Sequence, residues 1–439
     1  MVEITPFKGI TYNKEKIKNL DNVMSPPYDI INTDMQNNLY KKHENNFVKL
    51  ILGKQSPDDS ENNNKYTKAN QLFETWLQNN ILIESKNDAI YPYKIQYNHG
   101  KQTKTMNGFF ILLKLDPEYK QIKAHERTLS KPKADRLNLM KACKANLEPI
   151  QLLYIDKDDA IRKKIDKTIA KPILQVKGYD TFTHQLFKIE NEKLISDIRK
   201  NLKDKVLFIA DGHHRYQTAI NYAEEQKKQL KTPNKNPAFN YRMAILVNMF
   251  DEGLAILPTH RLIKKDNLSL PELLEKLHEF FIVEEKDTKT FQGTYNDIGK
   301  QIINDISTDN KHKFALYCKN KYFILTLKDE KVMDTLAKDH SKIWRTLDVS
   351  ILHKIILEKI MKINENNLED HVKYTRVDGE AVKLVDEGSF NLSFLMNATK
   401  IDELKAIADG GEHMPQKSTY FLPKMLSGLV MYKMSSKKK

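Results

Sequence analysis

Apolar and polar residues alternate along two stretches of the chain, residues 89–97 and 104–115. A period of two places successive side chains on opposite faces of a strand, so both stretches predict strands. The polar segment 98–101 between them is typical of a turn, and we expect an antiparallel hairpin. A helix is predicted over residues 69–79, where apolar side chains recur at helical spacing (Leu72, Phe73, Trp76 and Leu77).

The middle of the chain follows a strand–turn–helix–strand order. Residues 206–210 form an apolar run that is too short for a helix and suits a buried strand. A helix is expected to follow and to end near Gln229, and residues 242–248 predict the next buried strand. Before this region, a helix is predicted over residues 134–146 and a strand over 150–155. This order favours a mixed α/β (α+β) fold.

The last part of the chain has helices and strands of its own. Helices are predicted over residues 270–280 and 346–363, and strands over 314–318, 322–327 and 390–397. A chain of 439 residues is long enough for two or three domains. We expect an α/β core over residues 1–265 and an α+β subdomain or insertion over 266–345. Residues 346–439 are expected to form a helical and strand segment that packs back on the core.

Composition indicates an ordinary globular protein. Hydrophobic residues make up 40% and charged residues 30% of the sequence, which excludes collagen-like and low-complexity classes. No apolar run approaches the ~20 residues of a membrane helix, and the first residues lack the pattern of a signal peptide. Two cysteines, Cys143 and Cys318, are too few for a disulfide framework. We expect a cytoplasmic protein without a membrane partner.

The net charge of +14 raises the question of a nucleic-acid partner. The lysines are scattered among acidic residues, and no basic strand with interleaved aromatic residues is present, which argues against nucleic acid. A small phosphorylated ligand needs only a few focused Lys and Arg residues. The charge therefore favours a small-molecule substrate and a nucleotide as partners, and a homo-oligomer stays open.

The segment 211–215, Asp-Gly-His-His-Arg, carries the strongest chemical signal. It joins a predicted strand to a predicted helix, where Asp211 can cap the helix and Gly212 lets the backbone turn tightly. The first turn of a helix presents N–H groups and a positive dipole end, which bind phosphate. His213, His214 and Arg215 add donors, and Asp211 can hold Mg²⁺ or orient a histidine.

Two other interpretations of this segment stay open. Asp-Gly before a helix is a common turn, and adjacent histidines on a helix surface can be idle. A metal site of His213, His214 and Asp211 is the other alternative. Consecutive helical side chains point about 100° apart, which makes joint ligation of one ion by both histidines awkward.

The motif resembles that of the superfamily that joins ParB-like proteins, sulfiredoxins and free serine kinases. The kinase pattern Asp-Gly-His-x-Arg matches residues 211–215 at each fixed position. The resemblance implies a ParB/sulfiredoxin-like mixed-sheet core, with an additional α/β subdomain, that grips nucleotide phosphates. Sulfiredoxins carry a reactive cysteine before the His-Arg pair. This sequence has Gly212-His213 there, so sulfinic-acid repair is not expected.

A second resemblance covers nearly the whole chain. Its segments occur in a fixed order, at residues 25–29 (Ser-Pro-Pro-Tyr-Asp), 46–50, 125–136, 211–215, 257–261 and 414–421. Through them the chain resembles DUF1015, a bacterial and archaeal family of unknown function. Members that resemble this chain are often encoded near serine-biosynthesis genes, and this association favours phosphoserine chemistry.

Four of these segments add candidate site residues to the motif. In the segment 125–136, Glu126 could act as general base, and Lys133 and Arg136 could bind phosphate. The other segments offer polar contacts for a substrate pocket or a phosphate clasp: Tyr28, Asp29, His260, Arg261, Lys417, Ser418 and Thr419. For His260 and Arg261 the alternative is an ion-paired surface feature, and for residues 416–420 it is a simple turn.

These patterns predict phosphoryl transfer between a nucleotide and a small hydroxyl substrate, with L-serine and O-phosphoserine as first choice and the direction open. Mg²⁺ with ATP or ADP is the expected cofactor. Asp211, Glu126 and His213 are the expected catalytic residues. The four segments that carry Asp211, Glu126, His260 and Lys417 are expected to form one pocket. A nucleotide-binding ParB-like regulator and a metal-dependent hydrolase are the alternatives. No P-loop, dinucleotide fingerprint, zincin motif or nucleophile elbow is present in the sequence.

Overall fold

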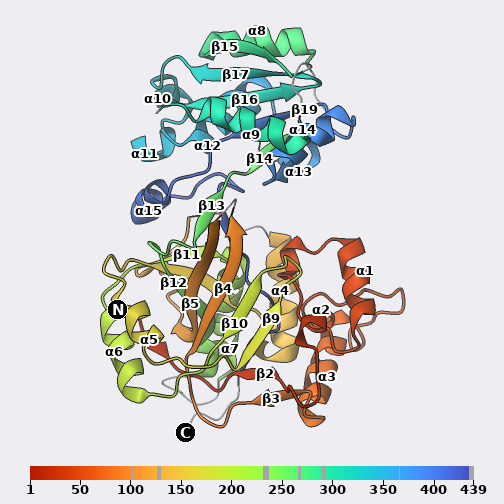
Figure 1. Cartoon of the computed structure of the whole chain (residues 1–439), viewed down its shortest axis with the longest axis vertical. Coiled ribbons are helices and arrows are strands. Elements are labelled where there is room, and N and C mark those ends of the chain that lie inside the picture. The colour runs from red at the N-terminus through yellow and green to blue at the C-terminus, as the bar shows by residue number, and fades with distance from the viewer. Residues whose placement is uncertain are drawn as a thin grey trace. The chain divides into compact units, whose positions relative to one another are not determined.

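The computed structural model describes residues 1–99, 102–125, 130–230, 237–264, 268–288, 293–309, 311–364 and 366–434. It is drawn in Figure 1. The chain divides into two compact units. Unit 1 contains Met1–Ala124, Thr128–Ala255 and Pro423–Lys439, and unit 2 contains His125–Arg127 and Ile256–Leu422. Both units mix helices with strands, which confirms the predicted α/β class.

Unit 1 is built on a mixed sheet, in which the described residues supply nine strands. Eight of them follow the order β6-β11-β8-β12-β5-β4-β10-β9, and β1 pairs with β5. Their bounds are β1 (Ile4–Thr5), β4 (Tyr91–His99), β5 (Gln102–Lys114), β6 (Ile122–Lys123), β8 (Ile150–Tyr154), β9 (Leu174–Lys177), β10 (Thr183–Leu186), β11 (Leu207–Asp211) and β12 (Tyr241–Asn248). Strands β4 and β5 pair antiparallel, with Tyr91 opposite Phe110, which confirms the predicted hairpin.

Two parallel pairings interrupt the antiparallel pattern of this sheet. Strand β12 runs parallel to β8, and β11 runs parallel to β6, whereas β11 and β8 are antiparallel. Two short ladders complete unit 1: β2 (Ile10–Tyr12) with β3 (Leu82–Glu84), and β7 (Ala145–Asn146) with β21 (Tyr432–Lys433). The second ladder ties the end of the described chain to the segment just before β8.

Helices cover the sheet of unit 1 on the face that carries alternate residues of β8. Ile150 and Leu152 share one buried apolar cluster with Tyr216 and Ile220, which face them from helix α7. The helical segments of unit 1 are η1 (Leu20–Asn22), η2 (Tyr28–Ile30), α1 (Thr33–Lys42), α2 (Val48–Ile51), α3 (Lys65–Gln78), α4 (Ser130–Cys143), α5 (Ala160–Asp166), α6 (Glu192–Leu202), α7 (His213–Gln229) and η3 (Ala238–Asn240). Helix α4 packs against α7 through Met140 and Ala219.

Helix α4 begins four residues before the predicted start at residue 134. The additional segment contains Pro132, a residue that would break the interior of a helix. The proline falls in the first turn, where its missing N–H would have no partner inside the helix in any case. The first turn of a helix therefore tolerates a residue that would break its interior.

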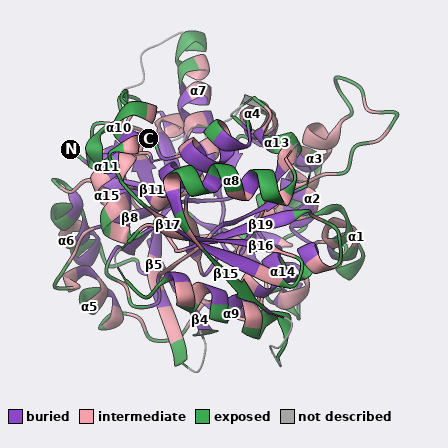
Figure 2. Ribbon diagram, turned by 90° about the horizontal axis from the view of Figure 1, so that it is seen from above, coloured by how far each residue is buried: buried purple, intermediate pink, exposed green. Residues whose placement is uncertain are grey.

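Unit 2 contains a sheet of order β15-β17-β16-β19-β14-β18. Its strands are β14 (His260–Ile263), β15 (Phe281–Asp287), β16 (Lys313–Cys318), β17 (Lys321–Leu327), β18 (Val372–Thr375) and β19 (Leu392–Met396), and β13 (Ala255–Leu257) and β20 (Tyr420–Leu422) lie outside it. Its helical segments are α8 (Leu270–Phe280), α9 (Tyr295–Ile306), α10 (Val332–Leu336), α11 (Lys342–Arg345), α12 (Asp348–Ile351), η4 (Leu352–Ile360), α13 (Leu368–His371), α14 (Asp378–Asp386) and α15 (Ile401–Asp409). Figure 2 shows buried residues along β16 and β19 and exposed residues on α8.

The boundaries of the units differ from the predicted division at residues 265 and 345. Strand β16 pairs with β19, so segments before and after residue 345 share one sheet. The C-terminal residues from Pro423 onward belong to unit 1. The predicted helix over 346–363 also differs, because it is a short α-helix followed by a π-helix. No helix in the described ranges has the length and apolar character needed to cross a membrane.

Candidate functional site

The turn between β11 and α7 requires glycine. Gly212 is the N-cap of α7 and adopts a left-handed φ of 91°. A Cβ atom at this position would lie 3.1 Å from both Arg215 Nε and Ile150 Cγ2. The pairing of β11 with β8 shifts register between Ile209 and Asp211, an irregularity that can redirect a side chain. Backbone and spacing together place a carboxylate directly before the start of a 17-residue helix.

Asp211 lies between two cations. Arg215 Nη2 donates to one carboxylate oxygen of Asp211, and Lys424 Nζ donates to the other. Burial disfavours the charge of Asp211, but Lys424, Arg215 and His213 outweigh burial and hold its pKa well below the usual range. Asp211 is therefore an ionised carboxylate throughout the neutral pH range.

Arg215 is buried and already bonded to the protein. Its second terminal nitrogen, Nη1, donates to the carbonyl oxygen of Pro149. Burial lowers the pKa of Arg215, but Asp211, Glu148 and Asp29 outweigh it, so the pKa lies above its ordinary value. The guanidinium is a fixed positive charge below the first turn of α7. Direct binding of phosphate by Arg215 stays a prediction.

Glu148 joins several of these groups, although the sequence did not point to it. Its Oε1 accepts hydrogen bonds from Ser427 Oγ at 2.8 Å and from the Tyr28 N–H at 3.2 Å. Its Oε2 lies 3.6 Å from Arg136 Nη1. Arg242 Nη2 donates to the Glu148 carbonyl at 2.6 Å. Glu148 thus connects the Ser-Pro-Pro-Tyr-Asp loop with α4, β12 and the C-terminal segment.

Three arginines line a small cavity of about 30 Å³ beside Glu148: Arg136, Arg215 and Arg242. This volume holds no more than one or two water molecules. Burial and the charge of Arg215 lower the pKa of Arg242 to about 9. The Arg136 guanidinium lies 4.0 Å from the centre of the Tyr28 ring, within cation–π range.

Within the described part of the chain, three buried polar atoms of this cluster have no hydrogen-bond partner: Ser25 Oγ, Arg242 Nε and Arg136 Nη1, which has only the ion pair with Glu148. Buried donors without a partner are uncommon in folded proteins, and a ligand or an ordered water is one way to satisfy them. The cluster therefore contains hydrogen-bond donors from which a bound anion could accept hydrogen bonds.

The structure brings most of the predicted residues of unit 1 together. Tyr28 and Arg136 lie beside Glu148, and Asp29 is close enough to Arg215 to raise its pKa. The backbone carbonyl of Lys133 accepts from Thr218 Oγ1 of α7 at 3.5 Å, so the first turn of α4 is next to α7. His213 is buried, and His214 is half-buried. Glu126 lies outside the described residues.

His260 and Arg261 belong to unit 2 and are fully buried on β14. The alternative of a surface ion pair is therefore wrong, because the strand lies inside the sheet between β18 and β19. His260 Nε2 lies 2.9 Å from Asp378 Oδ1. Arg261 donates to the carbonyl oxygens of Thr259 and Lys417. Both side chains hold elements of unit 2 together.

The predicted phosphate clasp at residues 417–419 also lies in unit 2. Lys417 is exposed and has a left-handed φ of 58°. Ser418 Oγ donates to the Pro415 carbonyl, and Thr419 Oγ1 lies 2.9 Å from His125 Nε2. The Ser418 hydroxyl is thus engaged within the turn, and the Thr419 hydroxyl is engaged with His125. Because the candidate residues fall in two units, the prediction of one common pocket stays a prediction.

No group of three or more His, Cys, Asp or Glu side chains in the described ranges is arranged to hold a metal ion. At the α7 turn itself, Asp211 offers an ionised carboxylate. Mg²⁺ that is bound mainly through phosphate oxygens and water needs only one or two carboxylates, so Asp211 fits a nucleotide-bound Mg²⁺.

A family model described as a protein of unknown function (DUF1015) matches residues 4–350. The chain belongs to the DUF1015 family. This match confirms the resemblance that the signature segments gave. It spans the Asp-Gly-His-His-Arg turn and ends within α12, so the segment 414–421 lies outside it.

Several solved structures resemble this DUF1015 protein at low similarity. A free serine kinase mutant in complex with ADP is 14% identical, with a TM-score of 0.37, over 71% of this chain and 87% of that chain. A conserved hypothetical protein from Pyrococcus furiosus is 13% identical, with a TM-score of 0.33, over 71% and 90%. SbnI with a C-terminal truncation, from Staphylococcus aureus, is 11% identical, with a TM-score of 0.33, over 72% and 85%. No curated protein matches the chain.

Sequence reasoning missed three members of the site: Glu148, Arg242 and Lys424. Lys424 is 213 residues from Asp211 in the sequence, and Glu148 is 279 residues from Ser427. No local pattern links positions so far apart. One signal was available for Arg242, because an arginine within an otherwise apolar strand, residues 242–248, needs a buried acceptor.

Proposed function

We propose that this DUF1015 protein transfers a phosphoryl group between a nucleotide and a small hydroxyl compound, with free L-serine and O-phosphoserine as the first pair to test. The observation that supports this is the glycine-capped N-terminus of α7, next to the ionised Asp211 and its two cations. Phosphoryl transfer needs positioning and charge neutralisation more than covalent chemistry, and the cluster supplies both.

In this proposal the nucleotide phosphates bind at the first turn of α7. The backbone N–H groups and the dipole of that turn favour a negative ligand, and Gly212 lets phosphate oxygens approach the backbone closely. His213 and His214 add donors from the same turn. Arg215, Arg136 and Lys424 supply positive charge around it, so that a phosphate arriving there meets a site already biased toward anions.

Asp211 holds Mg²⁺ on the nucleotide in this proposal. When bound, Mg²⁺ would neutralise phosphate charge. Asp211 has unused lone pairs although Arg215 and Lys424 each donate to it. Its depressed pKa keeps it ionised for this role. Glu126 remains the proposed general base toward the substrate hydroxyl, and Lys133 and Lys417 the proposed additional cations.

Phosphorus NMR tests this function directly. The purified full-length protein with Mg²⁺ is incubated with ATP or ADP plus L-serine, and separately with O-phosphoserine and ADP. We expect phosphoserine to form or disappear. If neither happens while nucleotide still binds, this substrate pair is wrong, and the ParB-like regulator becomes the better hypothesis. Measuring the metal content of the purified protein tests the hydrolase alternative.

A His214→Ala variant tests whether the α7 turn is the site. Losing one charge-assisted hydrogen bond to phosphate is expected to reduce transfer by about 10- to 100-fold. His278→Ala is the matched control, because His278 is exposed in the last turn of α8 in unit 2. Equal activity of the two variants would place the nucleotide elsewhere.

A further inference from the structure

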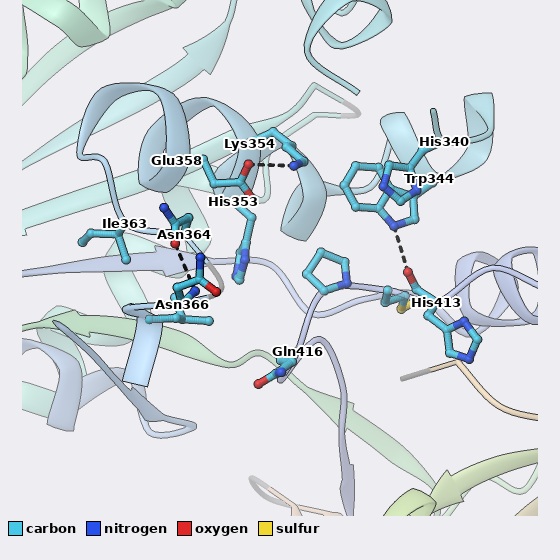
Figure 3. A pocket seen from close by; sticks show the side chains of 13 residues that line it. His340, Trp344, His353, Lys354, Glu358, Ile363, Asn364, Asn366, His413 and Gln416 are labelled. Carbon is cyan, nitrogen blue, oxygen red and sulfur yellow. Dashed lines mark hydrogen bonds and ion pairs between the residues drawn. The ribbon is translucent and has the colours of Figure 1, made fainter. Parts of the chain in front are cut away.

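Unit 2 contains a larger cavity that has no part in the proposed phosphoryl transfer. Its volume is about 370 Å³, within the range of small-molecule binding sites. Figure 3 shows Lys354 and Glu358 on one side of it, next to His353, and Trp344 on another side. The family match ends at residue 350, before the helix that carries the first three of these side chains.

The side chains of His353, Lys354 and Glu358 form one wall of the cavity. The helix that carries them is a π-helix, η4. The Met361 N–H at its end donates to the carbonyl oxygen of Ile356, five residues earlier, at 2.9 Å. π-helical turns are rare and occur frequently at functional sites. Here the wide turn brings His353, Lys354 and Glu358 to the same cavity.

The proton on His353 is fixed by its neighbour. Arg261 Nη2 lies 3.3 Å from His353 Nε2. Because a guanidinium only donates, Nε2 must be the acceptor, and the proton of the neutral ring is then on Nδ1. Burial, with the charges of Arg261 and Lys354, lowers the pKa of His353 well below its usual value. His353 therefore presents a neutral ring whose remaining polar atom, Nδ1–H, is a donor.

The same wall carries both signs of charge. Lys354 Nζ lies 2.6 Å from Glu358 Oε2, and about a quarter of each side chain is exposed (26% and 29%). The wall therefore offers two hydrogen-bond donors, the neutral His353 and the cationic Lys354. The carboxylate of Glu358 beside them is an anionic acceptor. Other parts of the lining are polar, such as Asn364, Asn366 and Gln416, and an apolar part consists of Ile363, Leu368 and Met414.

We propose that this cavity binds a free α-amino acid. The carboxylate of the ligand accepts hydrogen bonds from His353 Nδ1–H and Lys354 Nζ. The ammonium group donates to Glu358. The side chain of the ligand lies against the apolar part of the wall. This proposal does not depend on phosphoryl transfer, because its residues belong to a different unit from the α7 turn and no nucleotide is needed.

Saturation-transfer NMR with mixtures of the standard L-amino acids tests the proposal on the full-length protein without nucleotide. We expect at least one amino acid to bind. For that amino acid, calorimetry then compares the affinity with those of its analogue without the amino group and its analogue without the carboxylate. Each analogue is expected to bind at least about tenfold more weakly, because each lacks one charge-assisted contact.

Two variants separate the contacts. Lys354→Met is expected to weaken both the amino acid and the carboxylic acid analogue. Glu358→Gln is expected to weaken the amino acid and to leave the carboxylic acid analogue unchanged. Lys405→Met is the matched control, because Lys405 forms a similar pair with Asp409 at 2.6 Å on α15 and does not line the cavity.

Two results would overturn the proposal. One is that no amino acid binds to the wild-type protein at millimolar concentration. The other is that Lys354→Met and Glu358→Gln bind the amino acid as tightly as Lys405→Met does. Circular dichroism checks that the variants are folded, which is expected because both side chains are partly exposed. Both results are measured as binding of an amino acid without nucleotide, so they do not depend on whether the protein transfers phosphoryl groups.

Discussion

At the α7 turn, the backbone conformation of Gly212 and the charge of Asp211 are both unfavourable by themselves. The surrounding groups stabilise them. Gly212 has a backbone angle that residues with a side chain rarely adopt, and Asp211 is charged although most of its side chain is removed from solvent. Each is stabilised by groups that are remote in the sequence, such as Lys424. The turn therefore combines a local requirement for glycine with a long-range requirement for cations.

We expect Gly212→Ala to destabilise the protein more than the same change at a glycine with open surroundings. The left-handed φ alone costs a residue with a Cβ about 1–2 kcal/mol. At position 212 the new Cβ would also crowd Arg215 Nε and Ile150 Cγ2 at 3.1 Å. Gly388→Ala is the matched control, because Gly388 has a φ of 75° and no atom within 4 Å of a built Cβ. Urea denaturation measures both, and equal losses would contradict the crowding.

The carboxyl of Asp135 gives the protein a predictable sensitivity to acid. Burial raises its pKa, but Arg136, Lys65 and Tyr66 outweigh burial and lower it from 3.8 to about 2. A carboxyl with a depressed folded-state pKa stabilises the protein above its unfolded pKa, and this stabilisation disappears as the pH falls through the folded pKa. Stability from Asp135 should therefore decrease between about pH 4 and pH 2.

Melting temperatures over this pH range check the expectation. Asp135→Asn should be less stable than the wild type at neutral pH and should lose less stability on acidification. Glu15→Gln is the control, because Glu15 is exposed in a turn. If the two variants had the same pH profile, Asp135 would not contribute the acid-sensitive stability.

At the scale of elements, the sequence predicted those strands and helices that are specified by patterns within a short segment. The β4–β5 hairpin followed from alternation, and the strand β11 and helix α7 followed from a short apolar run and a glycine turn. The pattern over residues 346–363 indicated a helix but not its hydrogen bonding. The π-helical register of η4 depends on what packs around it, and periodicity over one or two turns does not distinguish it from an α-helix.

The start of α3 is a capping box that can be tested by itself. The Asn64 side chain accepts from the Thr67 N–H at 3.2 Å, and Thr67 Oγ1 accepts from the Asn64 N–H at 2.9 Å. Asn64→Ala is expected to lower the free energy of unfolding by about 1 kcal/mol. Asn62→Ala is the control, since Asn62 is exposed and precedes the helix. Chemical denaturation that shows equal stability for both variants would argue against the cap.

At the scale of the whole molecule, the connections that define the units are mostly invisible in the sequence. The pairs Asp211–Lys424 and Glu148–Ser427 join residues more than 200 positions apart. A pairing of the same kind crosses the predicted boundary at 345, because β19 pairs with β16. The sequence indicated candidate site residues in unit 1, whereas their partners emerge only when the chain is folded.

The C-terminal segment, which returns to unit 1, gives the last prediction. Ending the chain at residue 422 removes Lys424, Ser427 and strand β21. Among the described residues, Asp211 would then keep Arg215 as its hydrogen-bonded cation, and Glu148 Oε1 would lose the shorter of its two hydrogen bonds. Loss of one partner of a buried charged pair costs about 3–5 kcal/mol, so unit 1 should be strongly destabilised while unit 2 keeps its fold.

Hydrogen exchange measured by mass spectrometry resolves the two units in the same sample. We expect faster exchange in β8, β11 and α7 of the shortened chain and unchanged exchange in β16, β17 and β19. A chain that ends at Met434 is the control, because it keeps every described residue of the segment. Equal protection of β11 in both chains would mean that the C-terminal segment does not stabilise the α7 turn. Loss of protection in β16 as well would mean that the two units do not unfold independently.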